Sequence, residues 1–383
     1  MSPTARIIGA AETPYTRHPS PGQTTPVVMA RALHAALAAA DLTLADVDGL
    51  GLSSFSLEPD HAVDFAWRAG LKRLSWLMQD STGGASGLNL LQHAVRAIEA
   101  GDASTIVLVS GDRMDGPAFQ DLVLRYNSAT EHHLSPLPMV GPNALFALQT
   151  QRQMDAWGLG RDDYGRLAIS QRRWAGQNPG AVYRTPLTMA EYLAAPMVAP
   201  PLGRFDCVPP VTGADAVVVT TAALASGKKS VRVLSVQNTV NHDDQDGTGL
   251  TTGLDTAAPL AWAQSGIDPR DVDVVSVYDD YPSMVVAQLQ GLGIVPDGDI
   301  TRFISEQVAT GATPLNTSGG QLSAGQAGAA AGMHGLVEVV TQLTGTAGAR
   351  QLDDARLGVV TGYGMVLYRY GACANIAVLE AAR

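Results

Sequence analysis

The chain alternates short apolar segments with amphipathic ones, and this alternation runs along it twice. Residues 105–110 (TIVLVS) are almost continuously apolar, which is typical of a strand covered on both faces. Strands that alternate with helices predict a mostly parallel sheet flanked by helices. Because the same succession returns after residue 225, the sequence predicts an α/β fold with a duplicated core.

The predicted elements divide the chain into two halves and an insertion. In the first half we expect strands at 5–11, 47–53 and 105–110, with helices at 27–40 and 88–100. In the second half we expect strands at 231–236, 271–277, 357–361 and 374–379, with helices at 256–265 and 326–343. Between them, helices at 144–156 and 162–175 and Pro-rich turns indicate an inserted cap. The expected boundaries are 1–115 and 205–225 for the N-terminal half, 116–204 for the cap, and 226–383 for the C-terminal half.

Composition narrows the class of protein. The net charge of −11 argues against a nucleic-acid partner, since such affinity comes largely from Lys and Arg. Cys207 and Cys373 are the two cysteines of the chain, too few for a disulfide framework or a Cys-based zinc site. The sequence shows neither a signal peptide nor an apolar run long enough to span a bilayer. We therefore expect a cytoplasmic protein with no membrane span, no metal site and no covalently bound cofactor.

Several segments, taken in order, resemble the thiolase superfamily, especially its sterol-carrier-protein-type and archaeal members. They are 7–17 (IIGAAETPYTR), 151–188 (QRQMDAWGLG…YRTPLT), 199–221 (APPLGRFDCVPPVTGADAVVVTT) and 316–335 (NTSGGQLSAGQAGAAAGMHG). The resemblance covers nearly the whole chain. It implies the thiolase fold, which is a five-layered αβαβα core with an inserted loop domain, and a homodimer that pairs its core sheets.

The thiolase nucleophile is missing. In thiolases a Cys-Ala-Ser-Gly turn opens a helix, whose N-terminus favours the thiolate. Here the corresponding segment is 80–87 (DSTGGASG), and two registers fit it. An ungapped match places Gly84 at the cysteine position, whereas matching Thr-Gly-Gly places Asp80 there and needs a four-residue insertion. We prefer Gly84, and we interpret Ser86 as a helix cap rather than a replacement nucleophile.

The other thiolase positions also differ. In 277–283 (VYDDYPS), Tyr278 falls at a catalytic His position and Tyr281 at a Phe position, where we expect it to pack in the core. Gln326 replaces the His of the Gly-His-Pro turn, next to Gly325. The turn that carries the second thiolase cysteine is rich in tyrosine here, so either Tyr363 or Tyr368 takes its place. The candidate catalytic residues are Tyr278, Tyr363, Gln326 and Tyr368, and the candidate substrate-binding residues are Gly84, Ser86, Tyr281 and Gly325.

Two interpretations remain open. Some thiolase-like proteins, the steroid side-chain retro-aldolases, cleave β-hydroxyacyl-CoA thioesters with tyrosines instead of a cysteine. That resemblance implies Tyr278 or Tyr363 as the base, Gln326 and a backbone N–H near Gly84 as donors to the thioester oxygen, and Gly84 widening the pocket. It also implies a coenzyme A thioester as substrate and a small OB-fold, zinc-ribbon partner protein. The alternative is a non-catalytic subunit, scaffold or lipid carrier in a heteromeric thiolase or acyltransferase complex.

Overall fold

The computed structural model describes residues 5–57, 61–124, 128, 130–134, 141–242, 248–367 and 370–382. Its centre is a nine-stranded sheet in the order β3-β2-β4-β7-β1-β8-β11-β10-β9. The strands are β1 (Ala5–Glu12), β2 (Gly49–Ser53), β3 (Trp76–Gln79), β4 (Thr105–Asp112), β7 (Gly213–Thr221), β8 (Val231–Val240), β9 (Val274–Ser276), β10 (Leu357–Leu367) and β11 (Tyr370–Ala381). Outwards from the middle, β1-β7-β4-β2 in one half corresponds to β8-β11-β10-β9 in the other. This repeated order confirms the predicted duplication.

The sheet is mixed, so the prediction of a mostly parallel sheet is wrong. β2 runs parallel to β3 and β4, and β9 runs parallel to β10. The other neighbouring strands pair antiparallel. In each half the last strand along the chain, β7 or β11, runs opposite to the strands on both sides of it. β11 begins three residues after β10 ends, and so short a connection can join only antiparallel strands.

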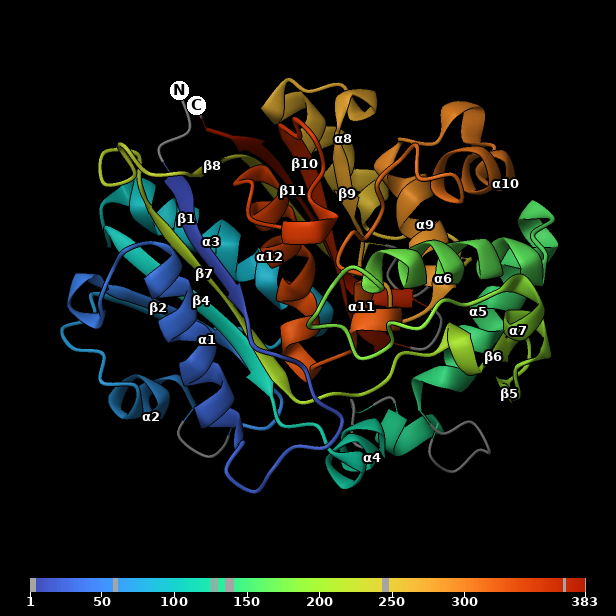
Figure 1. Cartoon of the computed structure of the whole chain (residues 1–383), viewed down its shortest axis with the longest axis horizontal. Helices are drawn as coiled ribbons and strands as arrows, with labels where there is room; N and C mark the ends of the chain where they lie inside the picture. Colours follow the sequence, from blue (N-terminus) through green and yellow to red (C-terminus); the bar gives the residue numbers. More distant parts are fainter. Residues whose placement is uncertain are drawn as a thin grey trace.

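Three layers of helices enclose the two halves of the sheet (Figure 1). The helices are α1 (Thr25–Ala39), α2 (His61–Arg68), α3 (Ser86–Ala100), α4 (Gly116–Leu124), α5 (Pro142–Trp157), α6 (Arg161–Ala175), α7 (Met189–Ala194), α8 (Leu254–Ser265), α9 (Pro282–Leu292), α10 (Ile300–Phe303), α11 (Gly320–Ala324) and α12 (Ala331–Leu343). α1 and α2 cover the N-terminal half, and α8 and α9 pack on the outer side of the C-terminal half. α3 and α12 lie between the halves and contact strands of both. The predicted five-layered αβαβα arrangement is confirmed.

The strand at 105–110 shows why this sheet needs apolar residues on both faces. Ile106 and Leu108 point into the core around α3 and α12, whereas Val107 and Val109 point into the core beneath α1. Side chains alternate between the faces of a strand, so a strand between two helix layers must be apolar at every position.

The segment between β4 and β7 contributes no strand to the nine-stranded sheet within the residues described. It contains α4 to α7 and the small two-stranded sheet of β5 (Met197–Ala199) and β6 (Leu202–Gly203). Hydrogen bonds fix this segment to the C-terminal half: the Gln171 side chain on α6 donates to Asp279 at 2.7 Å, and Asn178 donates to the Ser318 carbonyl at 2.8 Å. These contacts hold α6 and the turn after it against the loop that follows β9 and the segment before α11.

The predicted helix at 326–343 is too long at its start. α11 ends at Ala324 and α12 begins at Ala331, so Gln326 lies in the connection between them. Gly325 has a φ of 122° and Gly328 a φ of 61°, and both values are incompatible with a continuous right-handed helix. The other end of the prediction matches, and the 88–100 helix also ends as predicted, with Gly101 at a φ of 82°. No helix among the described residues is both long and apolar enough to cross a membrane.

Candidate active site

A cavity lies near the end of β9, between the Gly83–Ala85 turn and the helices α4 and α5. Its described lining consists of Phe55, Gly84, Phe119, Leu122, Val123, Pro142, Phe146, Val208, Tyr278, Asp280, Tyr281 and Gln326. The lining therefore brings together four residues singled out from the sequence: Gly84, Tyr278, Tyr281 and Gln326. Most of the remaining wall is apolar, so the few polar groups face a poorly hydrated space.

Gly84 and Tyr278 are packed against each other. A Cβ atom built on Gly84 would lie closer than 3.0 Å to the Tyr278 ring and to the Tyr363 carbonyl oxygen. The expectation that Gly84 widens the pocket is therefore wrong, because the tyrosine ring fills the space in front of it. A side chain at position 84 and a tyrosine at position 278 exclude one another.

The backbone of Tyr278 is fixed by α9, and its hydroxyl is directed to a carboxylate. Gln288 receives a hydrogen bond from the Tyr278 N–H at 3.2 Å and donates to its carbonyl at 2.6 Å. The Tyr278 hydroxyl donates to Asp280 Oδ2 at 3.0 Å. Two bonds to one amide therefore hold the loop that follows β9 and place the phenol at the cavity wall.

Asp280 is the polar cavity residue that the sequence analysis missed. Burial raises its pKa to about 7, and the nearby Asp279 adds to this, while the hydrogen bond from Tyr278 opposes it. Its Oδ1 is shielded and has no hydrogen-bond partner in the described part of the chain. The signal was present as a second aspartate in VYDDYPS, but sequence alone does not say which of the two faces the cavity.

Asp279 has a structural role, because its carboxylate holds neighbouring segments together. Its carboxylate accepts hydrogen bonds from the backbone N–H groups of Gln321 and Leu322 at 2.9 and 3.2 Å, besides the one from Gln171. It thereby holds the start of α11 and the inserted segment to the loop after β9. The two adjacent aspartates have different tasks because successive side chains of an extended loop point in opposite directions.

Tyr281 and Tyr363 both pack against Phe146. Tyr281 stacks on it with ring centroids 4.4 Å apart and donates its hydroxyl hydrogen to Asn143 Oδ1 at 2.6 Å. The Tyr363 ring lies 6.3 Å from that of Phe146, and its hydroxyl accepts from the Gly371 N–H at 2.7 Å. Tyr281 thus packs as expected while also bordering the cavity. Tyr363 is 1% exposed and is not among the described lining residues, and Tyr368 lies outside the residues that the structure describes.

The remaining candidates occupy different places. Gln326 borders the cavity, and its side chain makes long contacts with Gly328, with its Oε1 accepting at 3.3 Å and its Nε2 donating at 3.5 Å. Gly325 packs against Val211. Ser86 is the first residue of α3 and is fully buried, whereas Ala85 is the cap, so the prediction of a Ser86 cap is wrong. Neither Gly325 nor Ser86 is among the described lining residues.

Asp112, at the end of β4, positions two walls of the cavity. Its buried carboxylate accepts from the backbone of Phe55 at 3.0 Å and of Ala329 at 2.7 Å, and also from Ser54 and Ser56. One group therefore ties the turn that carries Phe55 to the turn that follows Gln326. Burial raises the pKa of Asp112, although these hydrogen bonds oppose the shift.

Neither cysteine offers an obvious nucleophile. Cys373 is buried in β11, and burial raises the pKa of its thiol to about 11. Cys207 is half-buried, and burial raises its pKa to about 12. Both thiols are protonated at neutral pH, and the described cavity lining includes neither.

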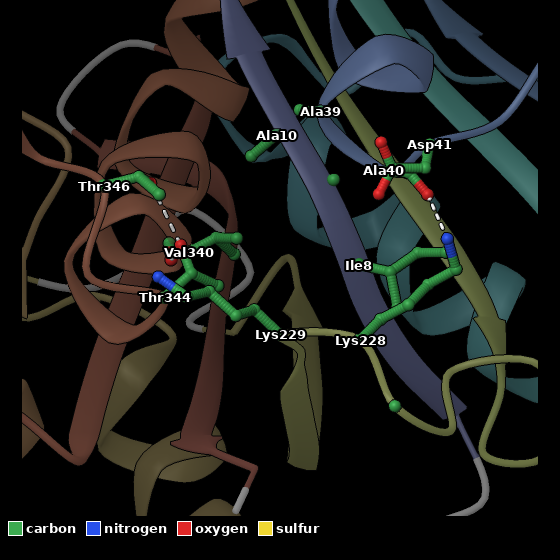
Figure 2. A pocket seen from close by; sticks show the side chains of 12 residues that line it. Ile8, Ala10, Ala39, Ala40, Asp41, Lys228, Lys229, Val340, Thr344 and Thr346 are labelled. Atoms are coloured by element: carbon green, nitrogen blue, oxygen red, sulfur yellow. Dashed lines mark hydrogen bonds between the residues drawn. The ribbon is translucent and has the colours of Figure 1, made fainter.

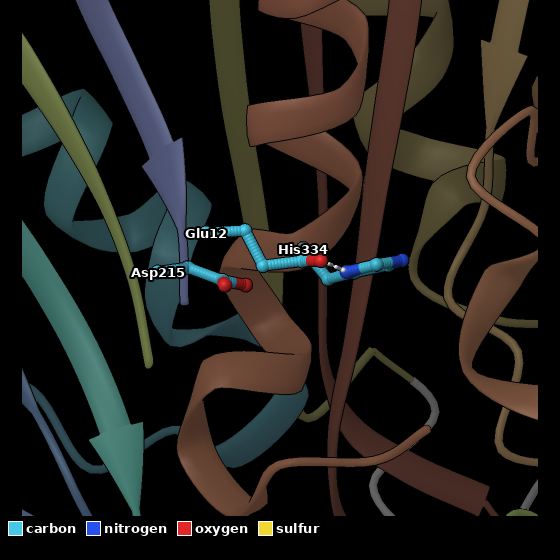
Figure 3. A group of neighbouring side chains, drawn as sticks. All are labelled: Glu12, Asp215 and His334. Atoms are coloured by element: carbon cyan, nitrogen blue, oxygen red, sulfur yellow. Dashed lines mark hydrogen bonds and ion pairs between the residues drawn. The ribbon is translucent and has the colours of Figure 1, made fainter. Parts of the chain in front are cut away.

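A second polar cluster joins the ends of β1 and α12 to β7 through Glu12, Asp215 and His334 (Figure 3). His334 on α12 bonds through Nδ1 to Glu12 at 2.7 Å and through Nε2 to the Ser318 hydroxyl at 2.7 Å. Tyr15 donates to the fully buried Asp215 at 2.9 Å. Among the residues described, Glu12, Asp215 and His334 are the one group of such side chains close enough to share a metal ion, and hydrogen bonds already satisfy them. Sequence reasoning placed His334 on a helix but did not foresee these partners.

We expect this cluster to make stability depend on pH. Burial alone would lower the pKa of His334, but Glu12, and then Asp215 and Asp279, raise it to about 9. Since the unfolded value is about 6.5, the stabilisation is complete below about pH 6.5 and is lost as the pH rises through about 9. The free energy of unfolding should fall by roughly 3 kcal/mol across this range. Calorimetry from pH 6 to 10 should show a smaller fall in His334→Gln and in Glu12→Gln, and equal pH dependence in all three proteins would contradict the assignment.

Another hollow lies beside the middle of β1, at Ile8, Gly9 and Ala10 (Figure 2). Lys228 and Lys229 border it, and the Lys228 ammonium donates to the carbonyl of Ala40, the residue that caps the C-terminus of α1, at 2.6 Å. A cation at a helix C-terminus satisfies free carbonyl groups. This hollow is therefore a place where lysine stabilises a helix end, and it contains none of the candidate site residues.

Comparison with known proteins agrees with this architecture. Residues 235–377 match the family described as "Thiolase C-terminal domain-like". The chain is 29% identical over 366 residues to a 17-hydroxy-3-oxo-4-pregnene-20-carboxyl-CoA lyase of Mycobacterium tuberculosis, covering 90% of this chain and 93% of that protein. It is 27% identical over 381 residues to a steroid side-chain-cleaving aldolase of Thermomonospora curvata, covering 94% and 95%.

Solved structures extend the comparison to the whole fold. An Ltp2-ChsH2(DUF35) aldolase superposes with a TM-score of 0.87 at 24% identity, covering 100% of this chain and 99% of that one. A monomeric SCP2-thiolase-like protein of Mycobacterium smegmatis superposes with a TM-score of 0.73 at 18% identity, covering 99% and 77%. The duplicated αβαβα core, the matched C-terminal segment and the full-length similarity to side-chain aldolases all support a thiolase-like chain.

Proposed function

We propose that the chain is an aldolase that cleaves a β-hydroxyacyl-CoA thioester by a retro-aldol reaction, without an acyl-enzyme intermediate. The observation that carries this proposal is the Tyr278 ring, which fills the space in front of Gly84 where a thiolase cysteine would project. A phenol at the cavity wall replaces a nucleophile with an acid–base group. Retro-aldol cleavage needs such a group and donors for an enolate oxygen, but no covalent bond to the protein.

Groups that line the cavity can account for every proton moved and every bond broken in the proposed reaction. Tyr278 takes the proton of the β-hydroxyl, the bond between Cα and Cβ breaks, and Cβ becomes the carbonyl carbon of a ketone or aldehyde. The electron pair of the broken bond passes to the thioester as an enolate. The Gln326 amide and a backbone N–H near Gly84 are suited to donate to its oxygen, and each donor of this type is worth about 3 kcal/mol. Protonation of Cα then gives the shortened acyl-CoA.

The substrate class that we propose is a bulky, apolar acyl chain of the steroid side-chain type. The aromatic and aliphatic lining residues suit such a chain, with Phe55, Phe119 and Phe146 providing the largest surfaces. The names of the two similar proteins from M. tuberculosis and T. curvata support the same class. Coenzyme A would remain the carrier and would not be a bound cofactor.

We further propose that the protein acts in the cytoplasm as a homodimer with a small OB-fold, zinc-ribbon partner. Support for the partner comes from the aldolase structure that includes a DUF35 chain. Support for the dimer comes from β3, the edge of the sheet, where Leu77 is 43% exposed and β2 is the sole strand neighbour within the described residues. Two unpaired cysteines suit a reducing compartment.

The test is product analysis. The purified chain, alone and with its DUF35-type partner, is incubated with CoA thioesters that carry a β-hydroxyl group on a branched apolar chain. We expect equal amounts of ketone or aldehyde and of shortened acyl-CoA by mass spectrometry, and no change in the mass of the intact protein. Absence of both products with the partner present would favour the non-catalytic subunit, and an acyl adduct on Cys207 or Cys373 would contradict the mechanism.

A further inference from the structure

We propose that Asp280 is the final acceptor of the substrate proton, so that Tyr278 and Asp280 act as one relay in the reaction. This inference rests on the proposed function and deepens it. Tyr278 touches the β-hydroxyl and is the catalytic residue, whereas Asp280 acts through it as a positioning and proton-holding residue. Neither the family resemblance nor the sequence pattern assigns Asp280 a role.

The direction of one hydrogen bond is the first argument. The Tyr278 hydroxyl donates its hydrogen to Asp280 Oδ2 at 3.0 Å. A phenol has one hydrogen, and once this is given to a carboxylate the oxygen can meet a substrate hydroxyl only as an acceptor. By accepting the phenol hydrogen, Asp280 therefore leaves the Tyr278 oxygen able to accept the substrate hydrogen, as a base must.

The second argument is the weakness of an isolated tyrosine as a base. With a reference pKa of about 10, only about one phenol in a thousand is ionised at pH 7. If the phenol passes its own hydrogen to Asp280 while it takes the substrate hydrogen, it never has to exist as a free tyrosinate. The proton then comes to rest on a carboxylate whose pKa burial raises to about 7, close to the working pH.

The third argument compares Asp280, which is half-buried, with Asp112 and Asp279, two fully buried carboxylates near the site. Asp112 accepts hydrogen bonds from several backbone and serine donors, and Asp279 accepts three. Both are thereby held in place by groups that prefer the ionised form. Within the described residues, Asp280 Oδ2 accepts from Tyr278, and Oδ1 has no hydrogen-bond partner. It can gain a proton without breaking another hydrogen bond.

Among the described residues, Tyr278 and Asp279 are the two groups that act most on the charge of Asp280 besides its burial. From its own loop, Tyr278 stabilises the ionised carboxylate, and Asp279 disfavours it. The other elements that border the cavity contribute apolar side chains such as Phe55 and Phe119 and the neutral amide of Gln326. Titration of the site near pH 7 should therefore report chiefly on Asp280 and its neighbour Asp279, whose pKa burial also raises to about 7.

The relay balances over one turnover. The O–H bond of the β-hydroxyl breaks and its hydrogen bonds to the Tyr278 oxygen, while the hydrogen of Tyr278 moves to Asp280 Oδ2. Cleavage of the bond between Cα and Cβ leaves the enolate beside a neutral Asp280. The proton then returns through Tyr278 to Cα, which completes the shortened thioester and restores both side chains without any outside acid or base.

The kinetic test uses Asp280→Asn with Asp255→Asn as the matched control on the distant helix α8. In the wild type we expect kcat to rise with pH through about 7 and then level off. Asp280→Asn should lower kcat about 100-fold at pH 7, change KM little, and regain activity steadily towards pH 10 as the phenol itself ionises. A purely structural role would not produce that recovery. Asp255→Asn should keep the wild-type pH profile, and a wild-type profile in Asp280→Asn would overturn the relay.

A second measurement works on the free protein. Infrared difference spectra across pH 7 should show the band of protonated carboxyl groups that titrate there, and Asp280→Asn should weaken this band in a folded protein. An unchanged band would overturn the relay whatever the kinetics. If the wild type is active and Asp280→Asn behaves like it, only the relay fails. If the wild type releases no ketone or aldehyde at any pH, the proposed function and the relay fail together.

Discussion

Tyr278→Phe is expected to lower kcat for carbon–carbon cleavage by about 10²- to 10⁴-fold, the usual contribution of a positioned general base. The ring packs against Gly84 and its backbone is held by Gln288, so phenylalanine should occupy the same space. KM should change little, because the hydroxyl acts on the breaking bond rather than on binding of the carrier. Stopped assays of the released ketone or aldehyde, with the thermal midpoint measured in parallel, separate lost chemistry from lost folding.

The matched control is Tyr183→Phe, which removes a hydroxyl bonded to Arg17 outside the cavity. It should retain the wild-type kcat. Tyr363→Phe tests the other tyrosine, whose hydroxyl accepts from Gly371 in the packed region behind Phe146. If Tyr363→Phe abolished turnover while Tyr278→Phe left it intact, the base would have to be reassigned to Tyr363.

Gly84→Ala is expected to reduce turnover at least 100-fold. The new methyl group would lie closer than 3.0 Å to the Tyr278 ring on one side and to the Tyr363 carbonyl on the other. The carbonyl belongs to the β10 backbone and cannot easily retreat, so the phenol must move, and an ångström of displacement at a catalytic group costs about 100-fold in rate. Overpacking should also lower the free energy of unfolding by about 1–3 kcal/mol.

Gly22→Ala is the control for this substitution, because a Cβ at Gly22 meets nothing within 4 Å. It should leave both kcat and the thermal midpoint unchanged. Wild-type turnover in a folded Gly84→Ala protein would show that Tyr278 does not need its present position. The same contact explains why cysteine and tyrosine chemistry do not coexist here: a nucleophile on residue 84 would occupy the space of the base.

Much of the fold could be predicted because a strand that is buried on both faces has apolar residues at successive positions of the sequence. β4 is recognisable since layers on either side require Val, Ile and Leu at successive positions. The directions of the strands were harder to predict. β7 and β11 run antiparallel to the strands beside them, and the sequence does not say which strands are neighbours in space. The connection at Gln326 was misread as helix because Gly and Ala are common both in packed helices and in tight links, and only the positive φ of Gly325 and Gly328 separates the cases.

The site could be predicted where it depended on position along a strand or helix. The resemblance to the thiolase segments placed Gly84 at the start of a helix and Tyr278 at the end of a strand, and the structure brings the two residues into contact. Asp280 was missed because the sequence does not say which of two adjacent aspartates faces the cavity, whereas Asp112 and His334 were missed because their environments are assembled from distant segments. Asp112 meets Ala329, which lies 217 residues further along the chain, and His334 meets Glu12, 322 residues earlier. The burial that raises the pKa values of Asp112 and Asp280, and the carboxylates that raise the pKa of His334, come together only in the folded chain.

The position of β1 in the middle of the sheet has a consequence for the synthesis of the protein on the ribosome. β1 pairs with β7 and β8, and Glu12 is followed by about 200 residues before β7 begins at Gly213. At a synthesis rate of about 5–20 residues per second, roughly 10–40 s pass before its first partner strand is made. β1 is therefore translated before the other eight strands of the sheet, and it can be enclosed only after β7 and β8 have been made. During that interval the nascent chain carries an unprotected apolar edge, and a chaperone that binds apolar segments during translation should find β1 among its targets.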